Sequence, residues 1–445
     1  MDPEAGTREA PSRPEAELSR DLGAAPLTLL GIATMTGAGI LVGVGIALQR
    51  TGGGGLLVVL ALNTLLAMLS AMSYAELASA IPRAGGAANY ARVAFGRGWS
   101  FLAGWIEWCA TAFAGSLYAW ALALYGLRLA ASLGWLPWEH HGGHPSVSAL
   151  AVLVLAVVMV VNAAGVSASG RLGAWMTWGQ ILSVLILGGL GVARIAADPG
   201  RLRLLEPFPP PASLAVLTAM GIIYVAFQGY VVISQAGDES IDPRRSLPRA
   251  ILRTALLAGV GCLLAAVALL AAVSPADLAS PATAASWAAW VDRVGGPDTI
   301  LAVAITRLAP RLGPVLLAMT VFGGAAAALN AVLFSAARAL FAMGRDRMLP
   351  EGLARVSRRR RSPWVAIVGT GALMAALAIL VPTMTDMVAL TSVMFLCLLL
   401  IVNLSCLRLR RRHGDELNYG FVMPLFPLVP ILAILGNAVL LVCVA

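Results

Sequence analysis

Long apolar runs recur along nearly the whole chain, and they constrain the fold more than any other feature. Each run holds about 20 residues or more, enough for a helix to cross a hydrocarbon core of roughly 30 Å. The composition agrees, because 59% of the 445 residues are hydrophobic and only 12% are charged. Alternating polar and apolar strands are missing, so the sequence predicts an all-α polytopic membrane protein.

Eleven spans are predicted from these runs. They cover residues 27–48, 56–81, 99–133, 147–166, 173–196, 214–236, 250–273, 313–343, 364–381, 387–407 and 424–444. Residues 1–25 have mixed charge and much Pro and Ala, which predicts a disordered cytoplasmic tail. The sequence therefore divides into this tail, a ten-helix core at 26–410 with halves at about 26–197 and 212–410, and a loop with an eleventh helix at 411–445.

The basic residues indicate the orientation of the chain. All 31 are arginine, and they lie in loops between the apolar runs. With a cytoplasmic N-terminus, 23 arginines fall at cytoplasmic segments and 8 outside, and the positive-inside rule favours this arrangement. Topology therefore accounts for the net charge of +9, and no nucleic-acid partner is predicted. The arginine and alanine bias suggests a bacterial inner membrane.

Cofactor, metal and enzyme motifs are not found. The five cysteines lie within or at the ends of apolar runs, without paired spacing. An external cluster has metal-ligand residue types, but two glycines before its last histidine leave its geometry unfixed, so we expect a solvated loop there: Glu139, His140, His141 and His144. Walker, HExxH and GxSxG sequences do not occur, so we expect no enzyme and no cofactor.

Two spans contain glycine-bearing sequences at mid-depth that predict interrupted helices. The first span carries Thr36-Gly37-Ala38-Gly39-Ile40, and the sixth carries Phe227-Gln228-Gly229-Tyr230. Glycine is common in membrane helices as a close-packing residue, so either sequence alone is a weak indication. Their positions correspond, however, because the first and sixth helices are equivalent in a fold built from two inverted five-helix halves.

Several motifs, taken in order, resemble the amino acid permeases of the amino acid, polyamine and organocation transporter superfamily. They are Gly37-Ala38-Gly39-Ile40, Tyr74-Ala75-Glu76-Leu77, Pro82-Arg83-Ala84-Gly85-Gly86, Ala226-Phe227-Gln228-Gly229-Tyr230, Asp238-Glu239, Asp242-Pro243-Arg244, Pro248-Arg249-Ala250-Ile251, and Arg338 followed by Met343-Gly344-Arg345-Asp346 and Leu349-Pro350. This resemblance implies the leucine-transporter fold, a 5+5 inverted repeat with broken helices 1 and 6. It also implies amino acid transport across the cytoplasmic membrane by alternating access. Family members usually have about twelve spans, one more than predicted here.

The chemistry of the predicted site follows from the broken helices. Backbone N–H groups of Ala38, Gly39 and Ile40 suit a substrate carboxylate, and carbonyls beside Met35 and around Val225 suit an ammonium group. Thr111, Ser116, Gln228 and Tyr230 contact the substrate or form hydrogen bonds between helices, and both alternatives are open. The candidate substrate-binding residues are Met35, Thr36, Gly37, Ala38, Gly39, Ile40, Thr111, Ser116, Val225, Phe227, Gln228, Gly229 and Tyr230.

Four acidic residues complete the prediction. Glu107 lies inside the third span, where a carboxyl group carries a proton, contacts a cationic substrate or pairs with an arginine. Glu76, Asp238 and Glu239 lie nearer the cytoplasmic surface, and we expect them to hold an inner gate closed through arginines.

Coupling is left open by the sequence. Some proton-coupled relatives carry a lysine in helix five, where this chain has Gln180, and the chain contains no lysine. Helix eight reads Gly323-Gly324-Ala325-Ala326-Ala327-Ala328-Leu329-Asn330, which offers little oxygen for sodium beyond the backbone. The predicted partners are thus an amino acid, the lipid bilayer, and either a proton or an exchanged amino acid. A polyamine or other amine transporter, or an amino-acid-sensing receptor, is the alternative.

Overall fold

The computed structural model describes residues 20–132, 135, 144–164, 166–206, 208, 214–274, 277–278, 283–297, 299–357, 359–381, 383–413 and 416–444. The predicted tail at 1–25 lies largely outside these residues, as do Glu139, His140 and His141 of the external cluster. The side chains of residues 38–42 and 165–172 also lie outside them.

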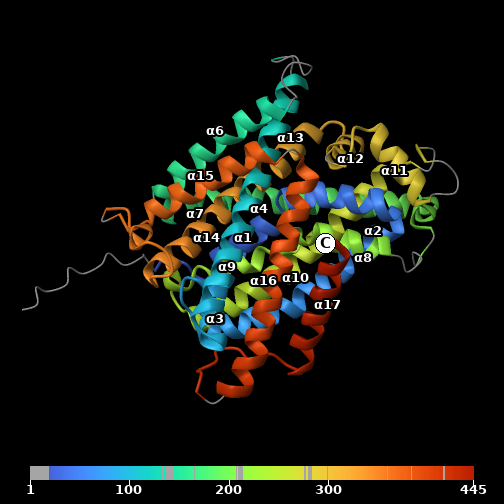
Figure 1. Ribbon diagram of the computed structural model, residues 1–445. Coiled ribbons are helices and arrows are strands. Elements are labelled where there is room, and N and C mark those ends of the chain that lie inside the picture. The colour runs from blue at the N-terminus through green and yellow to red at the C-terminus, as the bar shows by residue number, and fades with distance from the viewer. Residues whose placement is uncertain are drawn as a thin grey trace, which may run out of the picture.

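Helices dominate the described chain (Figure 1). Those in its first half are α1 (Ala24–Met35), α2 (Ala38–Ala80), α3 (Gly86–Phe95), α4 (Arg97–Ser132), α6 (His144–Ala163), α7 (Val166–Ala197) and η1 (Pro199–Leu205). Those in its second half are α8 (Leu214–Ile222), η2 (Ile223–Phe227), α9 (Gly229–Ser234), η3 (Gly237–Glu239), α10 (Pro243–Ala272), α11 (Ala284–Arg293), α12 (Ile300–Leu308), α13 (Gly313–Ala318), η5 (Met319–Gly323), α14 (Gly324–Arg345), η6 (Glu351–Ala354), α15 (Trp364–Leu380), α16 (Met384–His413) and α17 (Leu428–Val444).

Eight helices of the described chain are long and apolar enough to cross a membrane, and α1, α15 and α17 are shorter apolar helices. The backbone of α2 is non-helical at Gly52, with φ of 72° and ψ of −176°, a conformation that suits glycine. Gly52 therefore separates the first spanning helix, formed by α1 and the start of α2, from the second. Counted in this way, the described spans number eleven, as the sequence predicted.

The first helix lies at the centre of the bundle. Its segment α1 packs against α7, α9, α10 and α14 (Figure 1). The last two helices, α16 and α17, lie side by side, and α17 also packs on α2 and α8. Outside these spans lies the short helix α11, whose buried Trp287 packs against Gly52.

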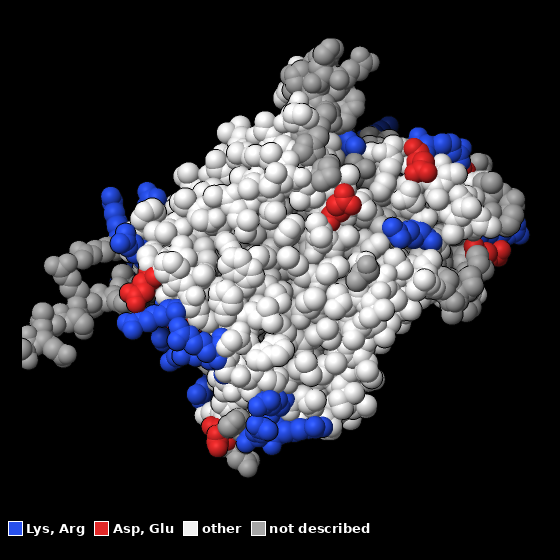
Figure 2. Space-filling model, in the orientation of Figure 1, with Lys and Arg blue, Asp and Glu red and all other residues white. Residues whose placement is uncertain are grey.

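Charged side chains separate toward the two ends of the molecule, and the surface between them is largely uncharged (Figure 2). We call one end the basic end; it holds Arg83, Arg345 and Arg410 and the short helix α3. The opposite end carries α11 and α12. Exposed Trp99 and Trp105 lie near the start of α4, close to the basic end, as aromatic side chains do at a membrane interface.

Candidate functional site

Helix 1 is interrupted between α1 and α2. The α1 helix ends at Met35, and α2 begins at Ala38 with Gly37 before it. Gly37 has φ of −71° and ψ of −149°, and no side chain caps this helix start. The first N–H groups of α2 therefore have no partner within their own helix, and the positive end of its dipole points into the interruption.

Helix 6 is interrupted at the matching depth. The chain changes from α8 to the 3-10 helix η2, and α9 then begins at Gly229 after Gln228. Ser392 of α16 holds the 3-10 segment from the side. Its hydroxyl accepts from Val225 N at 3.0 Å and donates to Ile222 O at 2.5 Å.

The two interruptions meet at Gly229. A Cβ atom at this position would lie 2.2 Å from Gly31 O, 2.4 Å from Thr34 Oγ1 and 2.5 Å from Met35 Cγ. Contacts this short exclude any side chain, so the start of α9 and the end of α1 approach each other backbone to backbone. Gly37 is similarly close to α14, because its Cβ would lie 2.6 Å from Ala328 Cβ.

Two polar side chains bind the carbonyls at the end of α1. The Tyr118 hydroxyl of α4 donates to Thr34 O at 3.1 Å, and the Gln180 amide of α7 donates to Thr36 O. Gln180 also lies against α14, since a Cβ at Gly324 would be 2.5 Å from its Nε2. The predicted coupling position is thus a neutral amide on α7, which is helix 5. It joins this helix to the interruption of helix 1 and lies beside α14, which is part of helix 8.

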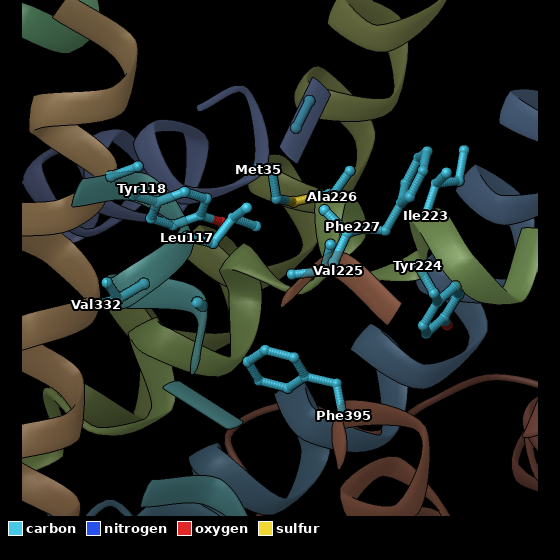
Figure 3. Packing of buried hydrophobic residues seen from close by; sticks show 14 of the residues in the cluster. Met35, Leu117, Tyr118, Ile223, Tyr224, Val225, Ala226, Phe227, Val332 and Phe395 are labelled. Atoms are coloured by element: carbon cyan, nitrogen blue, oxygen red, sulfur yellow. The ribbon is translucent and has the colours of Figure 1, made fainter. Parts of the chain in front are cut away.

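The side chains around the interruptions are largely apolar (Figure 3). Met35 lies beside Val225 and Phe227, with Leu117 and Phe395 nearby. Gln228 is one of the few polar side chains in this region. It is only 3% exposed, and neither of its amide atoms has a hydrogen-bond partner among the described residues. An unpaired amide in such a place is costly, which makes Gln228 available to a ligand.

The other polar candidates bond within their own helices. Thr111 Oγ1 donates to Glu107 O at 2.6 Å, Ser116 Oγ donates to Phe113 O at 2.8 Å, and Thr36 Oγ1 donates to Ile32 O at 2.7 Å. Tyr230 is fully buried and forms an edge contact with the ring of Tyr74, their centroids 5.6 Å apart. Ala38, Gly39 and Ile40 have helical backbone, but their side chains lie outside the described part of the structure.

The three acidic residues predicted at the gate pair with arginines at the basic end. Glu239 binds Arg338 through two bonds of 2.7 Å, and both side chains are buried. Asp238 binds Arg345 at 2.8 Å. These pairs join the end of helix 6 to α14.

The third pair lies elsewhere at the same end. Glu76 of α2 binds Arg410 of α16 at 3.1 Å and accepts from Met423 N at 2.7 Å. It therefore attaches the segment between α16 and α17 to α2. Leu22 lies beside the end of helix 6, because its N–H donates to Glu239 O at 3.0 Å.

Glu107 forms no ion pair within the described part of the chain. Its carboxyl oxygens accept from Gln235 Nε2 and from Ala87 N. Of the three roles the sequence left open, pairing with an arginine therefore does not occur among these residues.

Two small cavities flank the interruptions. One of about 40 Å³ lies toward the basic end and is lined by residues that include Ala33, Ala174 and Asn330. The other, of about 10 Å³, lies toward α12 and is lined by residues that include Thr36 and Ala304. A single water needs about 10–15 Å³, so this conformation admits no amino acid through either cavity.

Sequence reasoning missed three side chains that shape this region: Tyr118, Ser392 and Gln235. Each is a lone polar residue in an apolar span, as are many residues that only join helices. Their relevance depends on partners distant in sequence. The described residues also contain no group of three or more His, Cys, Asp or Glu side chains that could hold a metal ion.

A family model for amino acid permeases matches residues 22–445. The chain belongs to the amino acid permease family. The branched-chain amino acid permease BcaP of Bacillus subtilis (strain 168) is 27% identical over 430 residues, covering 95% of this permease and 87% of the relative. An uncharacterized transporter of Mycobacterium tuberculosis (strain ATCC 25618 / H37Rv) is 32% identical over 372 residues, covering 81% and 74% of the two chains.

A solved structure has the same fold. MhsT in complex with L-phenylalanine superposes with a TM-score of 0.66 at 16% identity, covering 96% of this permease and 98% of that chain. The predicted family and the all-α, leucine-transporter-like fold are confirmed. The permease is a multi-pass membrane protein, and its relatives are transporters rather than enzymes.

Proposed function

We propose that this permease carries a neutral, apolar amino acid across the cytoplasmic membrane by alternating access. The observation that carries the proposal is the meeting of two helix interruptions at Gly229, in a buried region of apolar side chains with an unpaired amide at Gln228. Such a region supplies backbone groups for both charges of a zwitterion without any charged side chain.

The substrate carboxylate belongs at the start of α2. The N–H groups of Ala38, Gly39 and Ile40 are the first of that helix and have no intrahelical acceptors. Together with the helix dipole they form a site for an anion. Gly37 leaves this end uncovered, because it has no side chain to cap it.

The substrate ammonium belongs at the end of α1, where the dipole has its negative end. The carbonyls of Thr34 and Thr36 are held by Tyr118 and Gln180, so they have fixed orientations. The carbonyl of Met35 lies between them in sequence and is a candidate acceptor, with Val225 on the opposing segment. The Gln228 amide then binds either charged group.

The side-chain pocket follows from the lining. Met35, Leu117, Val225, Phe227 and Phe395 supply apolar surface, and burial of apolar groups favours a substrate of the same kind (Figure 3). BcaP is named as a branched-chain amino acid permease and MhsT was solved with L-phenylalanine, and both substrates are neutral and apolar. A polyamine would require acidic side chains that this lining lacks.

We place one gate at each end of the molecule. We place the basic end in the cytoplasm, by the positive-inside rule, so the pairs Glu239–Arg338 and Asp238–Arg345 form an inner gate. The opposite end is closed where Gly45 meets the loop before α12, since a Cβ on Gly45 would lie 2.0 Å from Pro297 O. In the proposed transport cycle each end opens in turn.

The test is uptake and competition in proteoliposomes. We expect leucine, isoleucine, valine or phenylalanine to be exchanged, and we expect the decarboxylated amine and the N-acetyl derivative of the best substrate to compete poorly. Loss of either charge removes one of the two backbone sites. Equal competition by a diamine without a carboxylate would contradict the proposal and favour amine transport instead.

A further inference from the structure

A second buried polar cluster lies between the helix 6 interruption and the basic end. It joins three elements: Glu107 of α4, Gln235 at the end of α9, and residues 85–87 at the start of α3. Gln235 Oε1 accepts from Gly85 N at 2.9 Å, Gln235 Nε2 donates to Glu107 Oε1 at 2.5 Å, and Ala87 N donates to Glu107 Oε2 at 3.2 Å. Glu107 and Gln235 are both fully buried.

Two glycines allow the backbone to enter this cluster. Gly85 and Gly86 have φ of +113° and +35°, values that L side chains rarely adopt. A Cβ on Gly86 would lie 2.6 Å from Ser234 Oγ, 2.7 Å from Gln235 Nε2 and 3.3 Å from Glu107 Oε1. The Gly85-Gly86 pair of the sequence motif therefore brings two backbone N–H groups to two buried side chains.

The hydrogen bonds favour a carboxylate at Glu107 in this conformation. A backbone N–H can only donate, so Gly85 N identifies the oxygen of the Gln235 amide and directs its nitrogen toward Glu107. Ala87 N donates to the other carboxyl oxygen. Both oxygens thus face donors, an arrangement that suits a carboxylate. Ala87 also lies in the first turn of α3, whose dipole favours a negative charge.

Protonation would change this arrangement. A proton on either oxygen turns an acceptor into a hydroxyl group, which meets a donor and weakens one of the two bonds. The titratable groups that face Glu107 are Tyr74 of α2 and Tyr90 of α3, and both phenols are fully buried. No arginine of the described chain compensates the charge of Glu107, so the hydrogen bonds from Gln235 and Ala87 are its main support.

We propose that Glu107 is a proton-binding site whose occupancy controls the inner gate. The deprotonated carboxylate holds α3 and the end of helix 6 against α4, and proton binding releases them. This cluster lies beside the Asp238–Arg345 pair of the proposed inner gate, because Arg345 also donates to Ala84 O at 3.0 Å, directly before Gly85. We call the hydrogen bonds that join Glu107 to Gln235 and Ala87 the latch. The effect of the latch on transport rests on the proposed function, whereas the latch itself does not.

Hydrogen exchange measured by mass spectrometry tests the latch without any substrate. In the wild-type protein in lipid nanodiscs, we expect protection of the peptide that contains Gly85 and Ala87, corrected for intrinsic rates, to fall about tenfold between about pH 8 and about pH 5. In Glu107→Gln the protection should be low at every pH, because an amide accepts through one oxygen only. Glu351→Gln is the matched control, since it makes the same change on an exposed side chain at the same end.

The outcomes are distinct for the two proposals. Wild-type protection that does not change with pH, or a Glu107→Gln variant that follows the wild-type profile, would overturn the latch. If Glu107→Gln fails to fold, the pH profile of hydrogen-exchange protection in the wild-type protein still tests the latch. The same profile in Glu107→Asp, which keeps a carboxyl group, adds a second test. In a counterflow assay, the rate of amino acid exchange by the wild-type protein should rise as pH falls. The rate for Glu107→Gln should not change with pH. A wild-type protein that transports no amino acid at any pH would contradict the proposed function. The hydrogen-exchange data would still show whether the latch exists.

Discussion

At the scale of single residues, Gly229 is a position where a side chain cannot be added without displacing its neighbours. Because its Cβ would lie 2.2 Å from Gly31 O, we expect Gly229→Ala to force α9 away from α1, at a cost of about 1–3 kcal/mol for overpacking. Transport per folded molecule should fall at least about tenfold, since both backbone sites move with these segments. Gly189→Ala is the control, because that exposed glycine of α7 has nothing within 4 Å of its Cβ.

The measurement is uptake per folded molecule together with the midpoint of thermal unfolding. A Gly229→Ala protein with the activity and stability of Gly189→Ala would show that the close approach is unimportant. Close packing and substrate access act together at Gly229, so we expect stability and transport to fall together.

The role of a residue could be predicted from the sequence where its residue type alone indicates that role. The acidic residues Glu76, Asp238 and Glu239 do pair with arginines at one end. Gln180, a coupling candidate in the sequence, lies at the interruption of helix 1, a placement that the sequence did not predict. The partners of Glu107 were not predictable, because Gln235 and Ala87 reach it from elements 128 and 20 residues away in sequence.

At the scale of elements, two ion pairs join the end of helix 6 to α14, and only that of Glu239 with Arg338 is fully buried. Arg338 and Glu239 are 3% and 1% exposed, so removing one partner leaves an unpaired charge in a buried site. We expect Arg338→Gln to lower the stability by about 3–5 kcal/mol. Arg347→Gln breaks the pair with Glu351, whose side chains are 79% and 71% exposed, and should change little.

Thermal unfolding of the purified variants checks this prediction. Similar midpoints for Arg338→Gln and Arg347→Gln would mean that the buried pair does not hold the two elements together. In the double variant Arg338→Gln, Glu239→Gln no charge is left unpaired, so part of the loss should be recovered. That recovery separates the ion pair from the stacking of the Arg338 guanidinium group on the Phe334 ring.

The elements themselves were largely predictable, because a span of about 20 apolar residues has few alternatives in a membrane. The first and last residues of each helix were less predictable. The sequence placed the seventh span at 250–273, whereas α10 begins at Pro243, since a charged first turn can extend a helix beyond the hydrocarbon core. The π-helical segment η5 had no sequence signal either, as such segments depend on packing.

At the scale of the whole molecule, the order of the motifs predicted the family and the fold, both of which the comparisons confirm. The division into two inverted halves stays a prediction. So does alternating access, because one conformation with both ends closed contains no second state. Two close backbone contacts, one toward each end of the molecule, make the motion testable.

The two ends are each closed at a glycine, and this gives a test of alternating access. A Cβ on Gly45 would lie 2.0 Å from Pro297 O, and one on Gly237 would lie 2.7 Å from Arg83 N. Alanine at either position should therefore force its own end apart. Reporter cysteines at Ala304 and Ala174, in a background without the five native cysteines, line the cavities toward the two ends.

We expect Gly45→Ala to raise labelling of Ala304→Cys by a membrane-impermeant maleimide and to lower labelling of Ala174→Cys, while Gly237→Ala does the reverse. The physical reason is that a packed core with two arrangements responds to strain at one end by shifting its population, and each ligand path is open in only one arrangement. Right-side-out and inverted vesicles report the two sides separately, and they also test the cytoplasmic placement of the basic end. If either alanine variant raised labelling at both cavities at once, the ends would be independent of each other, and the molecule would behave as a channel with two unconnected gates.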